Sequence, residues 1–508
     1  MAKILEDPEK IADASLARRS SSLSERWFGR RLWPKIRPEL FVPLIVACAL
    51  LMENVDGTVI TTSLPMIARD LGMDAIVLKL GLTAYLVSLA VFIPISGWMA
   101  DKFGGRTVFC AAIATFMVSS MLCGVARSFA FFVTARFLQG VGGAMMVPVG
   151  RIVIVRTVSR DELVTALNYL TVPALLGPLV GPPLGGFITT YLSWRWIFFI
   201  NVPISILGIF LALRFMENIR EAEVPRLDVT GFLTSATGLS LLMFGLSTIT
   251  ERLLPREVAV ASIVIGAAIT YLYFRLARRT EMPLLDLGLF KIKTFLVGVG
   301  GGCLFRIGIG SIALLLPLLL QLGFGMNPLQ SGLLTCASAV GALFIKGAIR
   351  MFLRMYGFRS VLAYNALLSA VSVAVMALFT AKTSHLLIFL VLLLGGCVRS
   401  LQFTSLNAIT YADISDPLVS QATSMYATVQ QLSLGMGVTV GAFALQASSF
   451  LQKHGTIVAS DFWPALLIMG LITALSAYSA FTLPSDAGAE MAGRTPKMAL
   501  RAASDNSD

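Results

Sequence analysis

Two carboxylates lie three residues apart inside a long apolar stretch near the start of the chain. The segment reads M-E-N-V-D-G-T-V-I-T-T-S-L-P and contains Glu53 and Asp56. Residues with this spacing are neighbours on one face of a helix. Two acidic groups so close together in an apolar surrounding oppose each other's ionisation, which favours the uptake of a proton. The pattern predicts a site for a proton or another cation, with packing of Glu53 against a basic residue as the alternative.

Basic residues occupy apolar stretches in the second half of the chain. Arg306 lies in G-C-L-F-R-I-G-I-G-S, and Arg399 lies in G-G-C-V-R-S-L-Q-F-T. These two arginines could bind an anion through charge-assisted hydrogen bonds, or they could neutralise the two carboxylates of the first half. Neutralisation is the favoured prediction. Lys346 lies close to the end of its apolar stretch, so we expect it to reach the membrane surface.

The supply of reactive residues argues against several other chemistries. The 508 residues include 2 His and 6 Cys, and all six cysteines fall in apolar stretches, where a thiol acts as a small hydrophobe. Neither an H-E-x-x-H pair nor a G-x-x-x-x-G-K-[ST] phosphate loop occurs. No nucleophile, base and orienting group stand at a recognisable spacing. We therefore expect no metal, no cofactor and no enzymatic activity.

Long apolar segments must position these charged residues. The chain is 56% hydrophobic and 13% charged, whereas soluble domains are about 25% charged. Apolar stretches of about 20 residues, enough to cross a hydrocarbon core, recur along it. We predict an all-α polytopic membrane protein with fourteen transmembrane helices, at residues 42–65, 78–100, 107–126, 130–153, 163–190, 196–214, 229–249, 257–275, 294–322, 329–349, 360–380, 386–411, 420–448 and 462–483.

The distribution of basic residues predicts the orientation. Most of the 40 Lys and Arg residues lie in the first 40 residues and in alternate loops, and basic residues next to spans are retained in the cytoplasm. We expect both termini to be cytoplasmic. The net charge of +12 then reflects membrane topology rather than nucleic acid binding, which needs a basic face on a soluble module. The first 40 residues also lack the apolar core of a cleaved signal.

Two loops suggest an internal repeat. The loop after the second predicted span reads G-W-M-A-D-K-F-G-G-R (Gly97 to Arg106), and the loop after the tenth reads G-A-I-R-M-F-L-R-M-Y-G-F-R (Gly347 to Arg359). Both place basic residues around a glycine at a tight turn, as in transporters built from repeated halves. The second copy lacks the acidic residue.

Four motifs follow one another in the first half of the chain. The first is the loop at 97–106, and the others are R-F-L-Q-G-V-G-G-A-M-M-V-P (136–148), G-P-L-V-G-P-P-L-G-G (177–186) and W-R-W-I-F-F-I-N-V-P (194–203). With these motifs the chain resembles, over nearly its whole length, the fourteen-helix drug:proton antiporter branch of the major facilitator superfamily (EmrB/QacA type). The stretch Q-F-T-S-L-N-A-I-T (402–410) resembles a subgroup of exporters with poorly defined substrates.

The resemblance implies a fold of two six-helix halves with two additional central helices. The corresponding segments are a cytoplasmic N-terminal tail (1–41), an N-terminal six-helix half (42–214), two additional transmembrane helices with cytoplasmic linkers (215–293), a C-terminal six-helix half (294–483) and a cytoplasmic C-terminal tail (484–508).

The resemblance also implies roles for residues in the loop motif. Gly104 and Gly105 permit a tight turn, while Asp101 and Arg106 are expected to form a latch, with Gly97 and Gly104 of the same motif, that closes in one conformation and separates in the other. The alternative is an ordinary ion pair at a helix end, which contributes little.

Proton coupling is implied for Arg136 and for Asp56, which matches the acidic residue of the family. A charge at the depth of Arg136 needs a partner, with snorkelling as the alternative. Glu53, Gly57 and Thr61 depart from the family pattern.

The helix motif between residues 177 and 186 is expected to form a kinked, closely packed helix without ligand contact by its glycines. The motif residues are Gly177, Pro178, Gly181, Pro182, Gly185 and Gly186.

The function that these patterns favour is proton-driven export of amphipathic drugs or toxic compounds by alternating access. Export of an organic anion or a metal-chelate is the first alternative, and a non-transporting membrane receptor or scaffold is the second. The expected partners are the lipid bilayer, protons and a small-molecule substrate, without nucleic acid, and a monomer is compatible with the sequence. The resemblance implies the bacterial inner membrane as the location.

Overall fold

All regular structure in the described part of the chain is helical. The computed structural model describes residues 41–158, 163–221, 224, 227–249, 255–280, 283–415, 418–453 and 457–492, without the side chains of residues 163–175 and 420. No strand occurs among these residues. The all-α prediction is confirmed.

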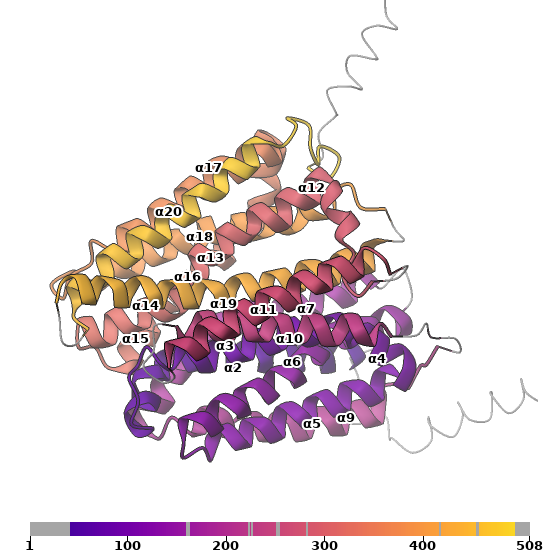
Figure 1. The fold of residues 1–508 in the computed structure, drawn as a ribbon, viewed down its shortest axis with the longest axis horizontal. Coiled ribbons are helices and arrows are strands. Elements are labelled where there is room, and N and C mark those ends of the chain that lie inside the picture. Colours follow the sequence, from indigo (N-terminus) through magenta and orange to yellow (C-terminus); the bar gives the residue numbers. More distant parts are fainter. Residues whose placement is uncertain are drawn as a thin grey trace, which may run out of the picture. The chain divides into compact units, whose positions relative to one another are not determined.

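The N-terminal half of the bundle consists of six spans (Figure 1). They are α2 (Phe41–Asp70), α3 (Lys79–Phe92) continued by η2 (Ile93–Ile95) and α4 (Ser96–Phe103), α5 (Gly105–Gly124), α6 (Phe129–Thr157), α7 (Leu163–Tyr191), and α8 (Trp196–Phe199) followed by α9 (Asn201–Phe215).

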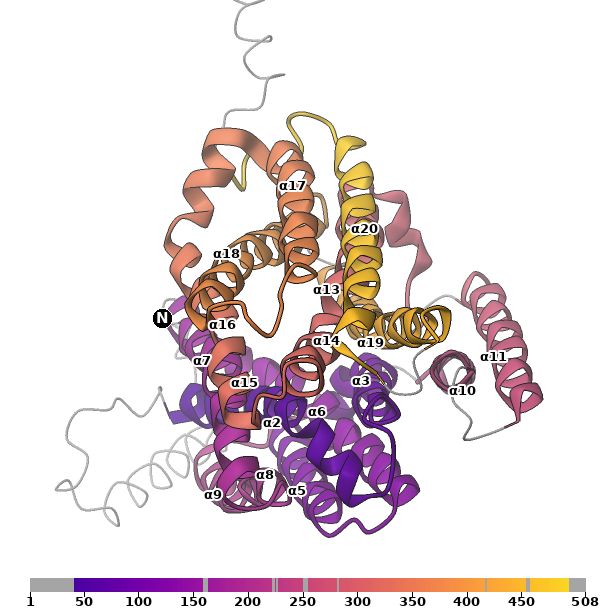
Figure 2. The same ribbon diagram turned by 90° about the vertical axis from the view of Figure 1, so that its left-hand side faces the viewer.

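Two additional spans form a hairpin, α10 (Val229–Thr248) and α11 (Arg256–Ala277). Helix α10 contacts both α3 and α19 (Val419–Leu451), and Figure 2 shows the hairpin beside these two helices. The hairpin therefore packs where the two halves of the bundle meet.

The C-terminal half again consists of six spans. The first is broken into η3 (Leu287–Lys291), α12 (Lys293–Leu296), η4 (Val297–Gly301), α13 (Gly302–Gly310), α14 (Ile312–Leu318) and η5 (Leu319–Gly323). The others are α15 (Pro328–Thr335) with α16 (Ala337–Phe344) and η6 (Ile345–Gly347), α17 (Ile349–Met376), α18 (His385–Thr410), α19, and η8 (Ala459–Asp461) with α20 (Phe462–Phe481).

Thirteen helices of the described residues are long and apolar enough to cross a membrane. Helix α7, with 29 residues, is an additional helix of spanning length. The prediction of a polytopic membrane protein is confirmed, and these helices are consistent with fourteen spans.

Local sequence explains where several helices begin and end. Ser128 and Asp228 cap α6 and α10 with side-chain oxygens that accept backbone N–H groups, and Asn327 forms a capping box with Gln330 before α15. Gly104 has a φ of 90°, which favours glycine and lets α4 turn directly into α5.

The two halves touch along two lines. Helix α3 packs against α19, and α7 packs against α15 and α16. Near the end of the bundle that holds Thr190, the backbone N–H of Leu329 donates to the Thr190 hydroxyl (3.2 Å), and Gln321 Nε2 donates to the carbonyl of Thr62 (2.9 Å). The halves are therefore joined by direct hydrogen bonds at this end.

Candidate functional site

A buried ion pair joins Asp56 and Arg136, the two residues for which the family resemblance predicts proton coupling. Arg136 Nη1 lies 2.8 Å from Asp56 Oδ2, and the side chains are 0% and 2% exposed. Helix α2 provides the aspartate and α6 the arginine. The guanidinium also lies 4.4 Å from the centre of the Tyr85 ring, in the range of a cation–π contact. Full burial and this pairing exclude the snorkelling alternative for Arg136.

Amide side chains complete the surroundings of Asp56. Its Oδ1 accepts hydrogen bonds from Gln139 Nε2 (2.8 Å) and Asn201 Nδ2 (2.9 Å). Gln139 Oε1 in turn accepts from Arg136 Nη1 (2.6 Å), and Asn201 also donates to Ser120 (3.0 Å). Buried charges are stable only when paired and hydrogen-bonded, so this Asp56 network fixes α2, α5, α6 and α9 in one arrangement.

Glu53 lies one helical turn from Asp56 and has a different environment. Its Oε2 is buried and has no hydrogen-bond partner among the described residues, and the same holds for the Tyr85 hydroxyl. Both side chains face Gly143, where a Cβ would lie 3.1 Å from the Tyr85 hydroxyl and 3.7 Å from Glu53 Oε1. Glu53 forms no ion pair among the described residues, but Arg151 lies near enough for its charge to act on Glu53, so packing near a basic residue remains the alternative. An unpaired buried carboxyl oxygen favours the neutral, protonated group.

A cavity of about 450 Å³ lies between the two halves. The first half contributes residues of α2 and α7, and the second half contributes residues of α13 to α16, η6 and α18. We call it the central cavity; its lining includes Gly57, Thr58, Thr61, Pro178 and Pro182 from the first half and Ile312, Leu316, Thr335, Ser338, Lys346, Arg399, Ser400, Phe403 and Thr404 from the second.

Arg399 and Lys346 both line the central cavity. Arg399 Nη2 donates to Ser338 (2.7 Å), while its Nη1 is buried and has no partner in the described part of the chain. Lys346 Nζ donates to the Thr404 hydroxyl (3.1 Å). Lys346 is an exposed residue at the end of its span and also lines the cavity, a contact that the expectation of a side chain at the membrane surface did not include.

Arg306 is fully buried at 0% exposure and does not line that cavity. Its guanidinium carbon lies 4.7 Å from the centre of the Tyr426 ring, and none of its three side-chain nitrogens has a hydrogen-bond partner among the residues described. The favoured prediction that Arg306 and Arg399 neutralise the first-half carboxylates does not hold, because Arg136 already pairs with Asp56 and Glu53 has no ion pair within the described residues.

The glycines of α7 allow a close approach to α2. A Cβ on Gly181 would lie 2.9 Å from Thr58 Cβ, and one on Gly185 would lie 2.5 Å from the Val59 carbonyl oxygen. Gly177 likewise faces Asn54. Such distances leave no room for a side chain, so the motif packs one helix on another, as small residues do in membranes.

The remaining motif residues of α7 face the second half. Pro178 and Pro182 line the central cavity, and a Cβ on Gly186 would lie 2.7 Å from Leu329 Cα. Some residues of the motif therefore pack against α2, and the others lie at the contact between the two halves.

The loop motif pairs differently from the predicted latch. Asp101 Oδ1 lies 2.7 Å from Arg156 Nη2, and the same nitrogen lies 3.0 Å from Glu221 Oε1. Arg106 donates instead to the carbonyl of Met216 (3.4 Å). The partner of Asp101 is thus at the end of α6, because Arg106 lies past the turn at Gly104 and points toward the segment after α9.

The glycines of this loop differ in importance. Gly104 packs on the Asn218 side chain, whose Cγ would lie 2.6 Å from a Cβ at that position. Gly97 has more room, since the nearest atom to a Cβ there is 3.9 Å away. Only Gly104 is required by conformation and by space.

Charge reversal tests the observed pair. Arg156→Asp is expected to lower transport, and Asp101→Arg/Arg156→Asp should restore part of it, whereas Asp101→Arg/Arg106→Asp should not. The Arg156 and Asp101 side chains are 25% and 32% exposed, so the free energy of unfolding should change by only about 1 kcal/mol or less. Vesicle uptake and thermal unfolding of all three variants provide the measurement. Restoration by the Arg106 swap alone would contradict the pairing.

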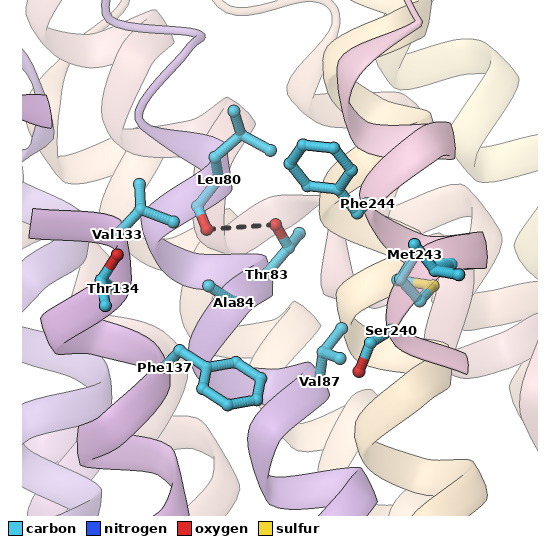
Figure 3. Close-up of a pocket in the computed structure, with 11 residues that line it drawn as sticks. Leu80, Thr83, Ala84, Val87, Val133, Thr134, Phe137, Ser240, Met243 and Phe244 are labelled. Carbon is cyan, nitrogen blue, oxygen red and sulfur yellow. Dashed lines mark hydrogen bonds between the residues drawn. The ribbon is translucent and has the colours of Figure 1, made fainter. Parts of the chain in front are cut away.

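A second cavity, of about 410 Å³, lies between α3, α6 and α10 (Figure 3). Its walls are mainly apolar, with Val133, Phe137 and Phe244 among them, and the Thr83 hydroxyl donates back to its own helix. None of the described residues that line it is charged, whereas Arg399 and Lys346 line the central cavity.

Sequence reasoning missed Gln139, Asn201 and Ser338, three polar residues that hold the charged ones. Gln139 and Asn201 lie in the quoted motifs (136–148 and 194–203). Polar side chains at membrane depth are costly and usually have a partner, and that signal would have found the first two.

The comparisons with known proteins agree with this architecture. The model of the Major Facilitator Superfamily matches residues 46–438. MdtD of Pectobacterium atrosepticum, a protein named for multidrug resistance, is 36% identical over 410 residues, which cover 81% of this chain and 87% of that protein. MdtD of Klebsiella pneumoniae is 36% identical over 455 residues, covering 87% and 94%.

Solved structures show the same fold at low identity. A D-xylose-proton symporter has a TM-score of 0.64 at 14% identity, with 88% of this chain and 98% of that chain covered. The human organic anion transporter MFSD10 has a TM-score of 0.57 at 16% identity, with 88% and 100% covered. The match of the family model over most of the chain, together with the two MdtD relatives, shows that this protein is a transporter of the Major Facilitator Superfamily.

Proposed function

We propose that this transporter is a proton-driven exporter of amphipathic drugs or toxic compounds, from the fourteen-helix drug:proton antiporter branch. One observation carries the proposal: α2 holds the carboxylates of Glu53 and Asp56 on the side toward α6, while the next residues of the same helix, Gly57 and Thr58, line the central cavity. Uptake of a proton on one side of α2 can therefore act through this helix on the cavity on its other side. The names of the MdtD relatives, which refer to multidrug resistance, support the class of cargo.

The contacts between the halves support alternating access. The halves meet near Thr190 and Leu329, and the central cavity extends toward Lys346 and Thr404 at the other ends of their helices. With both termini in the cytoplasm, as we propose, the joined end is the outer one. The cavity then receives cargo from the cytoplasmic side, and opening of the outer contact releases it.

The two carboxylates offer different places for the proton. Protonation of Asp56 removes one charge of its pair with Arg136 and loosens the Asp56 network, because a buried arginine without a counter-charge is unfavourable. Protonation of Glu53 breaks no ion pair in the described structure. Glu53 therefore takes up the proton at the lower cost, and Asp56 links protonation to the packing of four helices.

Reconstituted vesicles test the proposed function. The purified protein is placed in liposomes with an imposed pH gradient and a panel of cationic, neutral and anionic compounds. We expect flux of at least one compound that depends on the gradient and stops when a protonophore is added. Gradient-independent flux for every compound, or none at all, would exclude proton-driven export.

Glu53→Gln is expected to uncouple transport from the pH gradient, because glutamine resembles the permanently protonated carboxyl. Gradient-driven flux should fall by about tenfold or more, while exchange of cargo between the two sides in the absence of a gradient continues. Initial rates at several outside pH values measure the effect, and Glu53→Asp, which keeps the acid, is the control. A pH profile of Glu53→Gln identical to that of the wild type would assign the proton elsewhere.

A further inference from the structure

The described charged residues that line the central cavity are all cationic. Two cationic side chains, Arg399 and Lys346, line it, and none of the described residues in its lining is acidic. The carboxylates of α2 face away from it, toward α6 and Gly143. A compound in this cavity therefore meets positive charge from the second half without a competing carboxylate.

The Arg399 side chain has one nitrogen that can donate a hydrogen bond to an additional partner. Its residue is only 8% exposed, Nη2 is held by Ser338 at 2.7 Å, and Nη1 is buried without a hydrogen bond to any described residue. The serine fixes the guanidinium plane but brings no negative charge. An arginine at membrane depth almost always pairs with a charge or a ring of acceptors, and the described protein atoms supply one neutral hydroxyl.

One hydroxyl group binds the second cation. Lys346 donates to Thr404, which lies five residues after Arg399 on α18, and both residues line the central cavity. Ser400 lies between Arg399 and Thr404 on α18 and also lines the central cavity. The two cations and their hydroxyl partners therefore form one polar strip along α18, η6 and α16.

Part of the remaining lining is apolar and suits a hydrophobic body. Ile312, Leu316 and Phe403 belong to it. The volume of about 450 Å³ falls within the range of about 300–1,000 Å³ usual for sites of small organic ligands. The cavity therefore combines a cationic strip with an apolar wall.

We propose that the compounds carried by this protein are amphipathic organic anions, whose carboxylate or similar acidic group binds Arg399 and Lys346 while the apolar part lies against Ile312, Leu316 and Phe403. This substrate class rests on the proposed function, because it names the cargo of the same central cavity. Arg399 supplies a charge-assisted hydrogen bond from Nη1, and Lys346 supplies a second positive charge.

Three probes of one shape separate the effect of charge from that of size. They are 1-naphthoate, 1-naphthamide and 1-naphthylmethylamine, which are an anion, a neutral compound and a cation at pH 7. Binding to the purified full-length protein is measured by calorimetry in a neutral detergent, without anionic lipid. We expect 1-naphthoate to bind about tenfold or more tightly than the other two.

Four variants assign the preference to the two cations. Arg399→Gln should bring the affinities for the three probes within about twofold of one another, and Lys346→Gln should reduce the preference in part. Arg399→Lys should keep some of it, because the charge remains. Arg350→Gln is the matched control, since Arg350 is an exposed cation outside the cavity lining, and it should bind like the wild type.

The outcomes separate the cargo class from proton coupling. Equal affinity of the wild type for the three probes, or a preference for 1-naphthoate that persists in both Arg399→Gln and Lys346→Gln, would overturn the proposal. Calorimetry needs no gradient, so an Arg399-dependent preference without gradient-driven flux would contradict proton-driven export alone. Should Arg399→Gln fail to fold, Lys346→Gln and Arg399→Lys still decide the question.

Discussion

Asp56→Asn is expected to abolish gradient-driven transport, with a loss of about 100-fold in flux. The new amide could still accept hydrogen bonds through its oxygen, so most of the Asp56 network would keep its geometry. What disappears is the charge that compensates Arg136 and the group that can exchange a proton. Removing one partner of a buried ion pair costs about 3–5 kcal/mol, so the variant should also unfold at a lower temperature.

A double variant separates the structural role of Asp56 from its coupling role. Asp56→Asn/Arg136→Gln removes both charges, and it should regain much of the thermal stability that Asp56→Asn loses, because no unpaired charge stays buried. It should not regain gradient-driven flux. The measurements are thermal unfolding in detergent and flux in vesicles, both beside the wild type. Gradient-driven flux in Asp56→Asn at the wild-type rate would show that this carboxylate does not couple transport to protons.

The fold was largely predictable because each transmembrane span is formed by one continuous stretch of sequence. A run of about 20 apolar residues has few alternatives to a transmembrane helix, and the predicted stretches recur as helices of the structure. Helix ends were less predictable. Helix α2 continues past Pro65, the predicted end of the span, to Asp70, and Ile67 and Ala68 of this extension are buried against the rest of the bundle.

Two residues of the Asp56 network were predicted from the sequence, but their contact was not. The sequence identified Asp56 and Arg136, which are 80 residues apart and belong to α2 and α6. Their contact depends on the rotation of each helix in the bundle. In a span that is apolar on every side, the pattern of residues does not specify which face turns inward.

The same physical reason explains why the cavity contact of Lys346 was not predicted and why the pairing predicted for Arg106 is wrong. A lysine near the end of a span can reach either the membrane surface or a cavity, and only the packing of α16 and η6 against α18 turns Lys346 toward Thr404. Arg106 was paired with Asp101 because both lie in one motif. The turn at Gly104 sends the two side chains to different neighbours, namely Met216 and Arg156.

Gly186→Val is expected to hold the Thr190 end of the bundle open and to stop transport. A Cβ at Gly186 would lie 2.7 Å from Leu329 Cα and 2.9 Å from the Pro328 carbonyl carbon, and backbone atoms of a packed helix start cannot move aside cheaply. Overpacking costs about 1–3 kcal/mol. Because this contact joins the two halves, the bundle can avoid the cost by separating them, so the equilibrium shifts toward the conformation in which this contact is absent.

Cross-linking across the contact measures this shift directly. In a background without the native cysteines, the pair Thr190→Cys/Leu329→Cys replaces residues joined by a hydrogen bond of 3.2 Å, and its cross-linking yield should fall strongly when Gly186→Val is added. Gly208→Val is the matched control, because a Cβ there meets only Ile113 Cδ1 at 3.7 Å, and it should leave both yield and flux unchanged. Gly332→Val should act like Gly186→Val, since its Cβ would lie 2.8 Å from the Pro182 carbonyl carbon across the same contact. An unchanged yield in both α7 and α15 variants would mean that the halves do not separate at this end, and alternating access through this contact would be ruled out.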